Sequence, residues 1–238
     1  MAYKRVLLKL SGEALKENGD AILSGNALGN MAEMIKEIVN SGVQVCVVIG
    51  AGNIWRGKIA SEAGMERVQA DFMGMMGTVI NAVALSSRLR QLGVGSIVTS
   101  AIAPIDGISA EYNVELANHA METGQVVFLA GGTGKPYFTT DTAAALRALE
   151  LNCDAILMGK NGVKGVYDKD PRKEKDAKFF PVISFNEMLK LNLQIMDASA
   201  LELIKDKNIQ VRVFRMDAKN FIAAARGEDV GTVCKKGE

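Results

Sequence analysis

The stretch QVVFLAGGTGKPYFTTDTAAALRALEL, residues 125–151, carries the main signal of the fold. An apolar run comes first, glycines follow, and a run of helix-forming residues ends the stretch. This order is typical of a buried strand, a loop and a covering helix. Thr139 or Thr140 can cap the helix, and Asp141 suits the helix dipole. Because free amides at a helix start also attract anions, the loop is either a cap alone or a phosphate cradle as well.

The same alternation of strand and helix extends along the 238 residues. Further apolar runs predict strands at 5–10, 43–49, 95–102, 154–158 and 209–214. We therefore expect one α/β domain over 1–238, a three-layer αβα sandwich around a mostly parallel sheet. The polar stretch 167–180 indicates a solvated hairpin or a mobile flap, and its composition favours the solvated loop. The final GTVCKK, 231–236, is expected to be an edge strand.

Charge and hydropathy exclude several classes of partner. Lys and Arg number 28 against 27 Asp and Glu, so we expect neither a nucleic-acid nor a membrane partner. No apolar run is expected to reach the roughly 20 residues of a membrane helix, and the N-terminal MAYKRVLLKLSGEALKENGD lacks a cleavage-site pattern. The expected location is cytoplasmic.

The cysteines and the single histidine exclude most common catalytic chemistry. Cys46, Cys153 and Cys234 are widely spaced and are expected to be buried free thiols. His119 is isolated on a helical pattern, so a zinc cluster or a Ser-His-Asp triad is not expected. Catalysis, if any, would use lysine, carboxylates, backbone amides and a hard metal ion.

Two nucleotide-binding motifs are approached but not met. Gly-Ala-Gly-Asn at 50–53 begins a possible G-x-G-x-x-G fingerprint, yet the sixth position is Trp55. The glycines at 131–134 begin a possible P-loop, but Leu129 and Pro136 stand where it requires Gly and Ser or Thr. Neither a dinucleotide fingerprint nor a Walker A motif is predicted.

Charged residues and glycines nevertheless follow several predicted strands. Lys9 interrupts the first strand near its end, where it either snorkels or binds phosphate. Arg56 follows the second strand, and Asp141 the fourth. Ligands bind at the carboxyl ends of such strands, and Asp141 beside a phosphate would need a divalent cation between them. Together these residues favour phosphoryl transfer.

Two later segments allow more than one interpretation. Tyr167, Asp168 and Asp170 could hold a purine and ribose, or could simply form a turn. Asp197 is a plausible N-cap for the helix that follows it.

Six stretches in order resemble the bacterial uridylate kinases (UMP kinases) of the amino-acid kinase superfamily. They are KLSGEAL (9–15), VVIGAGNIWRG (47–57), AGMERVQADFMGMMGTVIN (63–81), GTGKPYFTTDTAAALRALE (132–150), GVYDKDP (165–171) and MDASA (196–200). The resemblance covers essentially the whole chain and implies an ATP-dependent phosphorylation of UMP to UDP with Mg²⁺, in pyrimidine biosynthesis.

The resemblance also implies residue roles. The ATP-side residues are Lys9, Leu10, Ser11, Gly12, Gly52, Arg56, Asn161, Tyr167 and Asp170. The UMP-side residues are Ala51, Asp71, Thr133, Gly134, Lys135, Pro136, Tyr137, Phe138, Thr139 and Thr140. Catalysis is assigned to Lys9, Asp141 and Asp197: Lys9 stabilises the transferring phosphoryl group, and Asp197 holds that lysine. Asp71 accepts from the ribose hydroxyls, and magnesium is held mainly by nucleotide phosphates.

Family membership further implies a homohexamer, activated by GTP and inhibited by UTP. The N-terminal half would bind the acceptor and the C-terminal half ATP. The methionine-rich stretch 71–83 serves either as a subunit interface or as an adaptable packed helix.

Three departures from the family pattern stand out: Ala51 replaces a glycine, Lys164 replaces an aspartate, and Asn161 replaces a threonine. Three alternatives remain: another kinase of the superfamily with a carboxylate or carbamate acceptor such as acetylglutamate, a nucleotide-binding protein without turnover, and a nicotinamide-linked oxidoreductase, which Trp55 disfavours.

Overall fold

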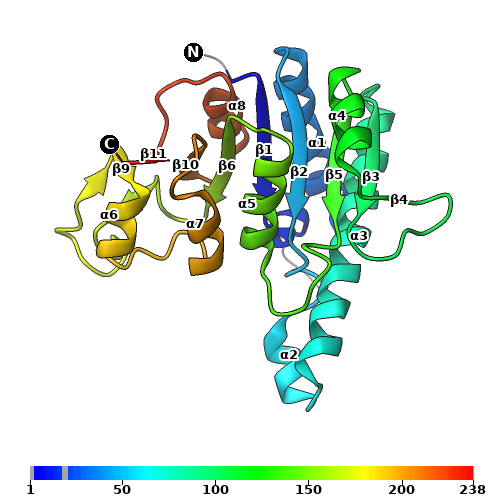
Figure 1. Ribbon diagram of the computed structural model, residues 1–238, viewed down its shortest axis with the longest axis horizontal. Helices are drawn as coiled ribbons and strands as arrows, with labels where there is room; N and C mark the ends of the chain where they lie inside the picture. Colours follow the sequence, from blue (N-terminus) through cyan, green and yellow to red (C-terminus); the bar gives the residue numbers. More distant parts are fainter. Residues whose placement is uncertain (1–2, 18–20, 238) are drawn as a thin grey trace.

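The computed structural model describes residues 3–17 and 21–237, and a nine-stranded sheet runs through this part of the chain (Figure 1). Its strand order is β4-β3-β5-β2-β1-β6-β10-β11-β9. The strands are β1 (Arg5–Leu10), β2 (Gln44–Ile49), β3 (Ser96–Ser100), β4 (Ala110–Glu111), β5 (Val126–Ala130), β6 (Ala155–Lys160), β9 (Val182–Ser184), β10 (Gln210–Arg215) and β11 (Thr232–Lys235). Neighbouring strands are parallel except β10 and β11. The predicted fold class is therefore confirmed.

Helices cover both faces of the sheet, because side chains of a strand alternate between faces. On β1, Val6, Leu8 and Leu10 pack against helices α1 (Gly25–Asn40), α3 (Arg67–Gln91) and α8 (Ala218–Ala225). The opposite face, which includes Leu7, is covered by α4 (Val114–Glu122), α5 (Thr140–Glu150), α6 (Phe185–Lys190) and α7 (Ala198–Ile204). Burying one such leucine stabilises the fold by about 1.5–3 kcal/mol. Lys9 shares the face of Leu7 and therefore lies toward α5.

The predicted strands agree with the observed ones to within one or two residues, but the edge-strand prediction is wrong. β11 lies inside the sheet, between β10 and the short strand β9. Its second side is occupied because Val182–Ser184 pairs with it in parallel. The polar stretch 167–180 is a solvated loop closed by an antiparallel pair, β7 (Val166–Tyr167) and β8 (Phe179–Phe180), as predicted.

Helix α3 is the longest element and extends with α2 (Gly57–Glu62) beyond the carboxyl ends of the strands (Figure 1). By length and composition it could cross a membrane, which contradicts the expectation that no segment would be long and apolar enough. However, Ala82, Leu85 and Leu89 are wholly buried against the sheet. This packing is that of a core helix.

The cysteines are buried free thiols, as predicted. Burial raises the pKa of Cys234 to about 12, so its thiol stays protonated and unreactive at neutral pH. His119 lies exposed on α4.

Candidate functional site

Lys9 is a charged residue near the end of β1, at the edge of the sheet where the parallel strands end. Its Nζ lies 2.5 Å from Oδ1 of Asp141, in the first turn of α5, and both side chains are mostly buried. The pair places a positive and a negative group at the N-terminus of α5, where free amides and the helix dipole favour an anion. A phosphate brought here would meet Lys9 and those amides together.

Asp197 was expected to hold Lys9, but in the structure it contacts other residues. It caps α7 by accepting from the amide of Ala200 at 2.8 Å, and it accepts from the hydroxyls of Thr139 and Thr142. Burial opposes ionisation, but these donors outweigh it and hold the pKa of Asp197 below its ordinary value. Asp197 thus connects the start of α7 to the start of α5, and the ion-pair partner of Lys9 is Asp141. The predicted helix cap is confirmed: the Thr139 hydroxyl accepts from the amides of Asp141 and Thr142.

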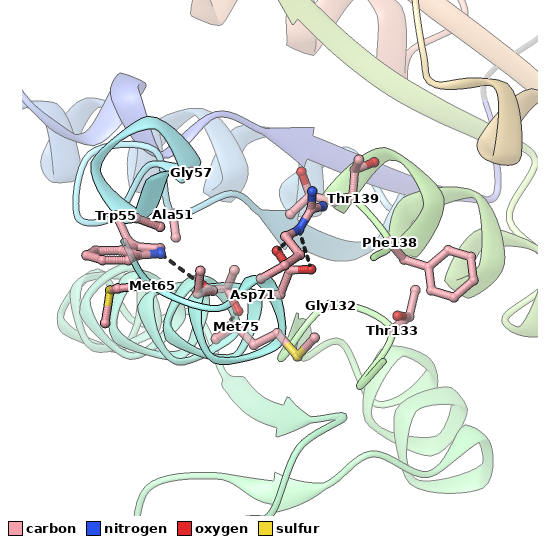
Figure 2. Close-up of a pocket in the computed structure, with 16 residues that line it drawn as sticks. Ala51, Trp55, Gly57, Met65, Asp71, Met75, Gly132, Thr133, Phe138 and Thr139 are labelled. Carbon is pink, nitrogen blue, oxygen red and sulfur yellow. Dashed lines mark hydrogen bonds and ion pairs between the residues drawn. The ribbon is translucent and has the colours of Figure 1, made fainter. Parts of the chain in front are cut away.

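A cavity of about 730 Å³ opens beside α5, between α3 and the glycine loop (Figure 2). Asp71, on α3, points into it, toward the loop that carries Gly132 and Thr133. Asp71 accepts from the amide of Tyr137 at 2.7 Å, and both of its oxygens lie 2.8 Å from Nε of Arg67. These donors fix the carboxylate as an acceptor directed at whatever enters the cavity.

The loop expected to hold UMP is only partly in contact with the cavity. Thr133, Phe138, Thr139 and Thr140 line it. Tyr137 contributes its amide and has a positive φ of 72°, a conformation rarely adopted by residues other than glycine. The remaining loop residues are not among the described residues that line the cavity: Gly134, Lys135 and Pro136.

The loop after β2 forms the opposite wall, and it is held by buried amides. Asn81, on α3, donates to the carbonyl of Gly50 at 2.8 Å and exchanges hydrogen bonds with Asn53. Gly12 packs so closely that a Cβ there would collide with Asn53 and Gly50. Ala51 lines the cavity and has no positive φ, so alanine is accommodated without strain where the family has glycine.

Arg56 follows this loop and is held away from the ion pair of Lys9. Its Nε donates to the carbonyl of Gly52 at 2.9 Å, and its guanidinium pairs with Glu13. Burial raises the pKa of Glu13, but the hydrogen bonds from Arg56 and Lys16 outweigh burial and keep this pKa below its ordinary value. With 58% of its side chain exposed, Arg56 is free to turn toward an anion.

Four of the residues expected on the ATP side line two hollows. Tyr167 and Asp170 line a cavity of about 530 Å³ between the 160–172 segment and residues 191–195. Ser11 and Asn161 line a smaller hollow of about 350 Å³ beside η1 (Gly12–Leu15). Leu10 is fully buried in the core, so only its backbone is available to a ligand.

Sequence reasoning missed two charged residues of this region. Lys160, at the end of β6, lines the second cavity, and Arg67 precedes Asp71 by one helical turn. Both signals were present in the sequence: a lysine ending an apolar strand, as at Lys9, and an i, i+4 ion-pair spacing on a helix.

A lysine at a helix N-terminus, with a carboxylate beside it, is suited to positioning phosphates for transfer. The chain belongs to the amino acid kinase family, whose family model matches residues 4–215.

The chain is similar, along nearly its full length, to proteins named uridylate kinase or UMP kinase. The uridylate kinase of Mycoplasma capricolum is 48% identical over 221 residues, which is 92% of each chain. The crystal structure of UMP kinase from Ureaplasma parvum superposes with a TM-score of 0.93 at 42% identity, covering 99% of this chain and 100% of that one. The UMP kinase from Bacillus anthracis gives a TM-score of 0.95 at 38% identity, covering 100% and 98%. The resemblance drawn from the motifs is confirmed.

Proposed function

We propose that the protein transfers the γ-phosphoryl group of ATP to UMP, giving UDP. The observation that carries this proposal is the Lys9–Asp141 ion pair at the start of α5. Thr140, next to Asp141, lines the cavity that contains Asp71, and Lys160, on the strand beside Lys9, lines the cavity that contains Tyr167. The full-length similarity to uridylate kinases supports the same reaction.

UMP would occupy the cavity beside α3. The carboxylate of Asp71 is already oriented by Arg67 and by the Tyr137 amide, and it would accept from the ribose hydroxyls. Uracil would lie against the Phe138–Thr140 wall. The UMP phosphate would then face the start of α5, with Arg56 turning from Glu13 to bind it as a fork.

Lys9 would stabilise the charge that develops on the transferring phosphoryl group. Asp141 keeps its ammonium in place through the ion pair. Asp197 acts further out, because its hydrogen bonds to Thr139 and Thr142 fix the first turn of α5. Phosphoryl transfer needs such positioning and charge neutralisation more than a histidine base.

ATP would bind on the other side of this centre, and the N-terminal half of one domain would hold UMP while the C-terminal half holds ATP. Magnesium fits here as an ion carried by nucleotide phosphates. Among the described residues no group of three His, Cys, Asp or Glu could hold a metal, whereas Asp141 could supply a single carboxylate. When bound, the ion neutralises phosphate charge.

We further propose a cytoplasmic homohexamer, activated by GTP and inhibited by UTP. Self-association is supported by an exposed apolar stripe on α3, formed by Val68, Phe72, Met76 and Ile80. These residues repeat every four positions and therefore share one helix face. An exposed stripe of this kind favours burial against another protein surface.

A steady-state assay coupled to ADP formation, with ATP and magnesium, tests the choice of acceptor. UMP, CMP, AMP and acetylglutamate would be compared at equal concentration. We expect turnover confined to UMP. Turnover of acetylglutamate would keep the fold and replace the uridylate assignment by a carboxylate kinase, and ligand binding without turnover would indicate a nucleotide-binding protein.

A further inference from the structure

A second lysine projects toward the transfer centre from the strand next to Lys9. β1 and β6 are parallel neighbours, with Lys9 opposite Met158. Lys160 lies two residues beyond Met158, so it leaves β6 on the same face, the face covered by α5 and α7. Both lysines therefore converge on the N-terminal end of α5.

The ammonium of Lys160 has few partners for a partly buried charge. Its Nζ donates to the carbonyl of Ile195 at 2.8 Å. Among the described residues no carboxylate forms an ion pair with it, and Asp141, whose charge acts on it, pairs with Lys9. An ammonium has three donors, so one carbonyl leaves two of them available.

The charges of Asp141 and Lys9 both act on Lys160. Burial lowers the pKa of Lys160 below its ordinary value, Asp141 acts against this, and the charge of Lys9 lowers it further. Asp141 thus lies near both lysines but pairs with Lys9. A partly buried ammonium with unused donors is stabilised by an anion.

The position of Lys160 indicates which anion. It lines the cavity of about 530 Å³ that also contains Tyr167 and Asp170, and it leaves β6 on the face that carries Lys9. It therefore stands between the cavity that would hold the donor nucleoside and the centre that would receive the transferred phosphoryl group. A polyphosphate chain that extends from the donor cavity to the transfer centre must therefore pass Lys160.

We propose that Lys160 binds the non-transferred phosphates of the donor nucleotide, as a second cation beside Lys9. This inference rests on the proposed function, because it takes a nucleoside triphosphate as donor. The Ile195 carbonyl holds the ammonium in place before the nucleotide arrives. Lysine acts on phosphate as a compact point charge with rotatable donors, so it can keep the carbonyl bond while binding phosphate oxygens.

Nucleotide binding to the full chain tests this assignment. Lys160→Met removes the charge and keeps an apolar stem of similar length, and Lys160→Arg keeps the charge. Lys164→Ala is the matched control, since Lys164 is an exposed lysine of the same segment that lies over the Phe179 ring. A non-hydrolysable ATP analogue with magnesium, and adenosine as its competitor, would be titrated calorimetrically.

We expect Lys160→Met to weaken binding of the ATP analogue at least tenfold and to leave adenosine within twofold of wild type. Lys160→Arg should restore part of the loss, and Lys164→Ala should have no effect. Equal weakening of the analogue and adenosine would show that Lys160 only holds the 191–195 segment, and unchanged binding would also overturn the proposal. If the wild type itself fails to bind the analogue, the proposed function fails instead.

Discussion

Gly77 and Ala51 form a tight contact that joins α3 to the loop beside the cavity that contains Asp71. A Cβ added at Gly77 would lie 2.8 Å from the Cβ of Ala51 and 3.7 Å from that of Ile54. Overpacking of this kind costs about 1–3 kcal/mol. Alanine in a helix interior is favoured over glycine by about 0.5–1 kcal/mol, which offsets part of the cost. We therefore expect Gly77→Ala to destabilise the protein by about 1 kcal/mol, a fall in Tm of about 2–4 °C.

Removing the opposing methyl group should reverse the sign. In an Ala51→Gly background the contact is relieved, so Gly77→Ala should raise the free energy of unfolding by about 0.5–1 kcal/mol. Thermal and urea unfolding of the wild type, both single variants and the double variant measure this coupling as a double-mutant cycle. The same change in the wild-type background should raise KM for UMP and leave KM for ATP unchanged, because Ala51 lines the cavity proposed to bind UMP. An equal effect of Gly77→Ala in both backgrounds would refute the reasoning.

Three further substitutions test the site. Lys9→Ala should lower kcat by orders of magnitude and leave UMP affinity nearly unchanged. Steady-state kinetics measure both quantities. A normal kcat would remove Lys9 from the mechanism. Asp71→Asn should raise KM for UMP at least about tenfold, because a hydrogen bond to a charged group is worth about 1.5–3 kcal/mol. The variant should also show a smaller preference for UMP over 2′-deoxy-UMP. An unchanged preference would place the ribose elsewhere. Asp197→Ala should cost about 1 kcal/mol at neutral pH through the lost cap. Because the folded pKa of Asp197 is lowered, its contribution is present above the unfolded pKa of about 3.9 and is lost as pH falls through the folded value. Unfolding curves should therefore converge at acid pH, and a gap that widens there would contradict this.

Much of the fold follows from local patterns, because buried parallel strands are continuous apolar runs and their covering helices are amphipathic. The strand at 5–10 was predicted with its observed bounds. The position of β11 was not predictable in this way. Its placement depends on β9, a three-residue strand about 50 residues earlier, and so short a segment carries little periodicity of its own.

The site was predictable as a set of residues, but less so as a set of contacts. Lys9 was found because a charge stands out at the end of an apolar strand, and Asp71 was found through the resemblance to the uridylate kinases. The partner of Lys9 depends on how α5 and α7 are placed above β1, which no local signal specifies. In the structure Lys9 pairs with Asp141, and Asp197 instead accepts hydrogen bonds from the threonines at the start of α5.

The central claim is the transfer of a phosphoryl group from ATP to UMP, and isotope transfer measures it most directly. The purified protein would be incubated with magnesium, UMP and ATP labelled in the γ-phosphate, and the products separated by chromatography. We predict that label appears in the β-phosphate of UDP in equal amount to the ADP formed. Label released only as inorganic phosphate, or retained in ATP, would contradict the account.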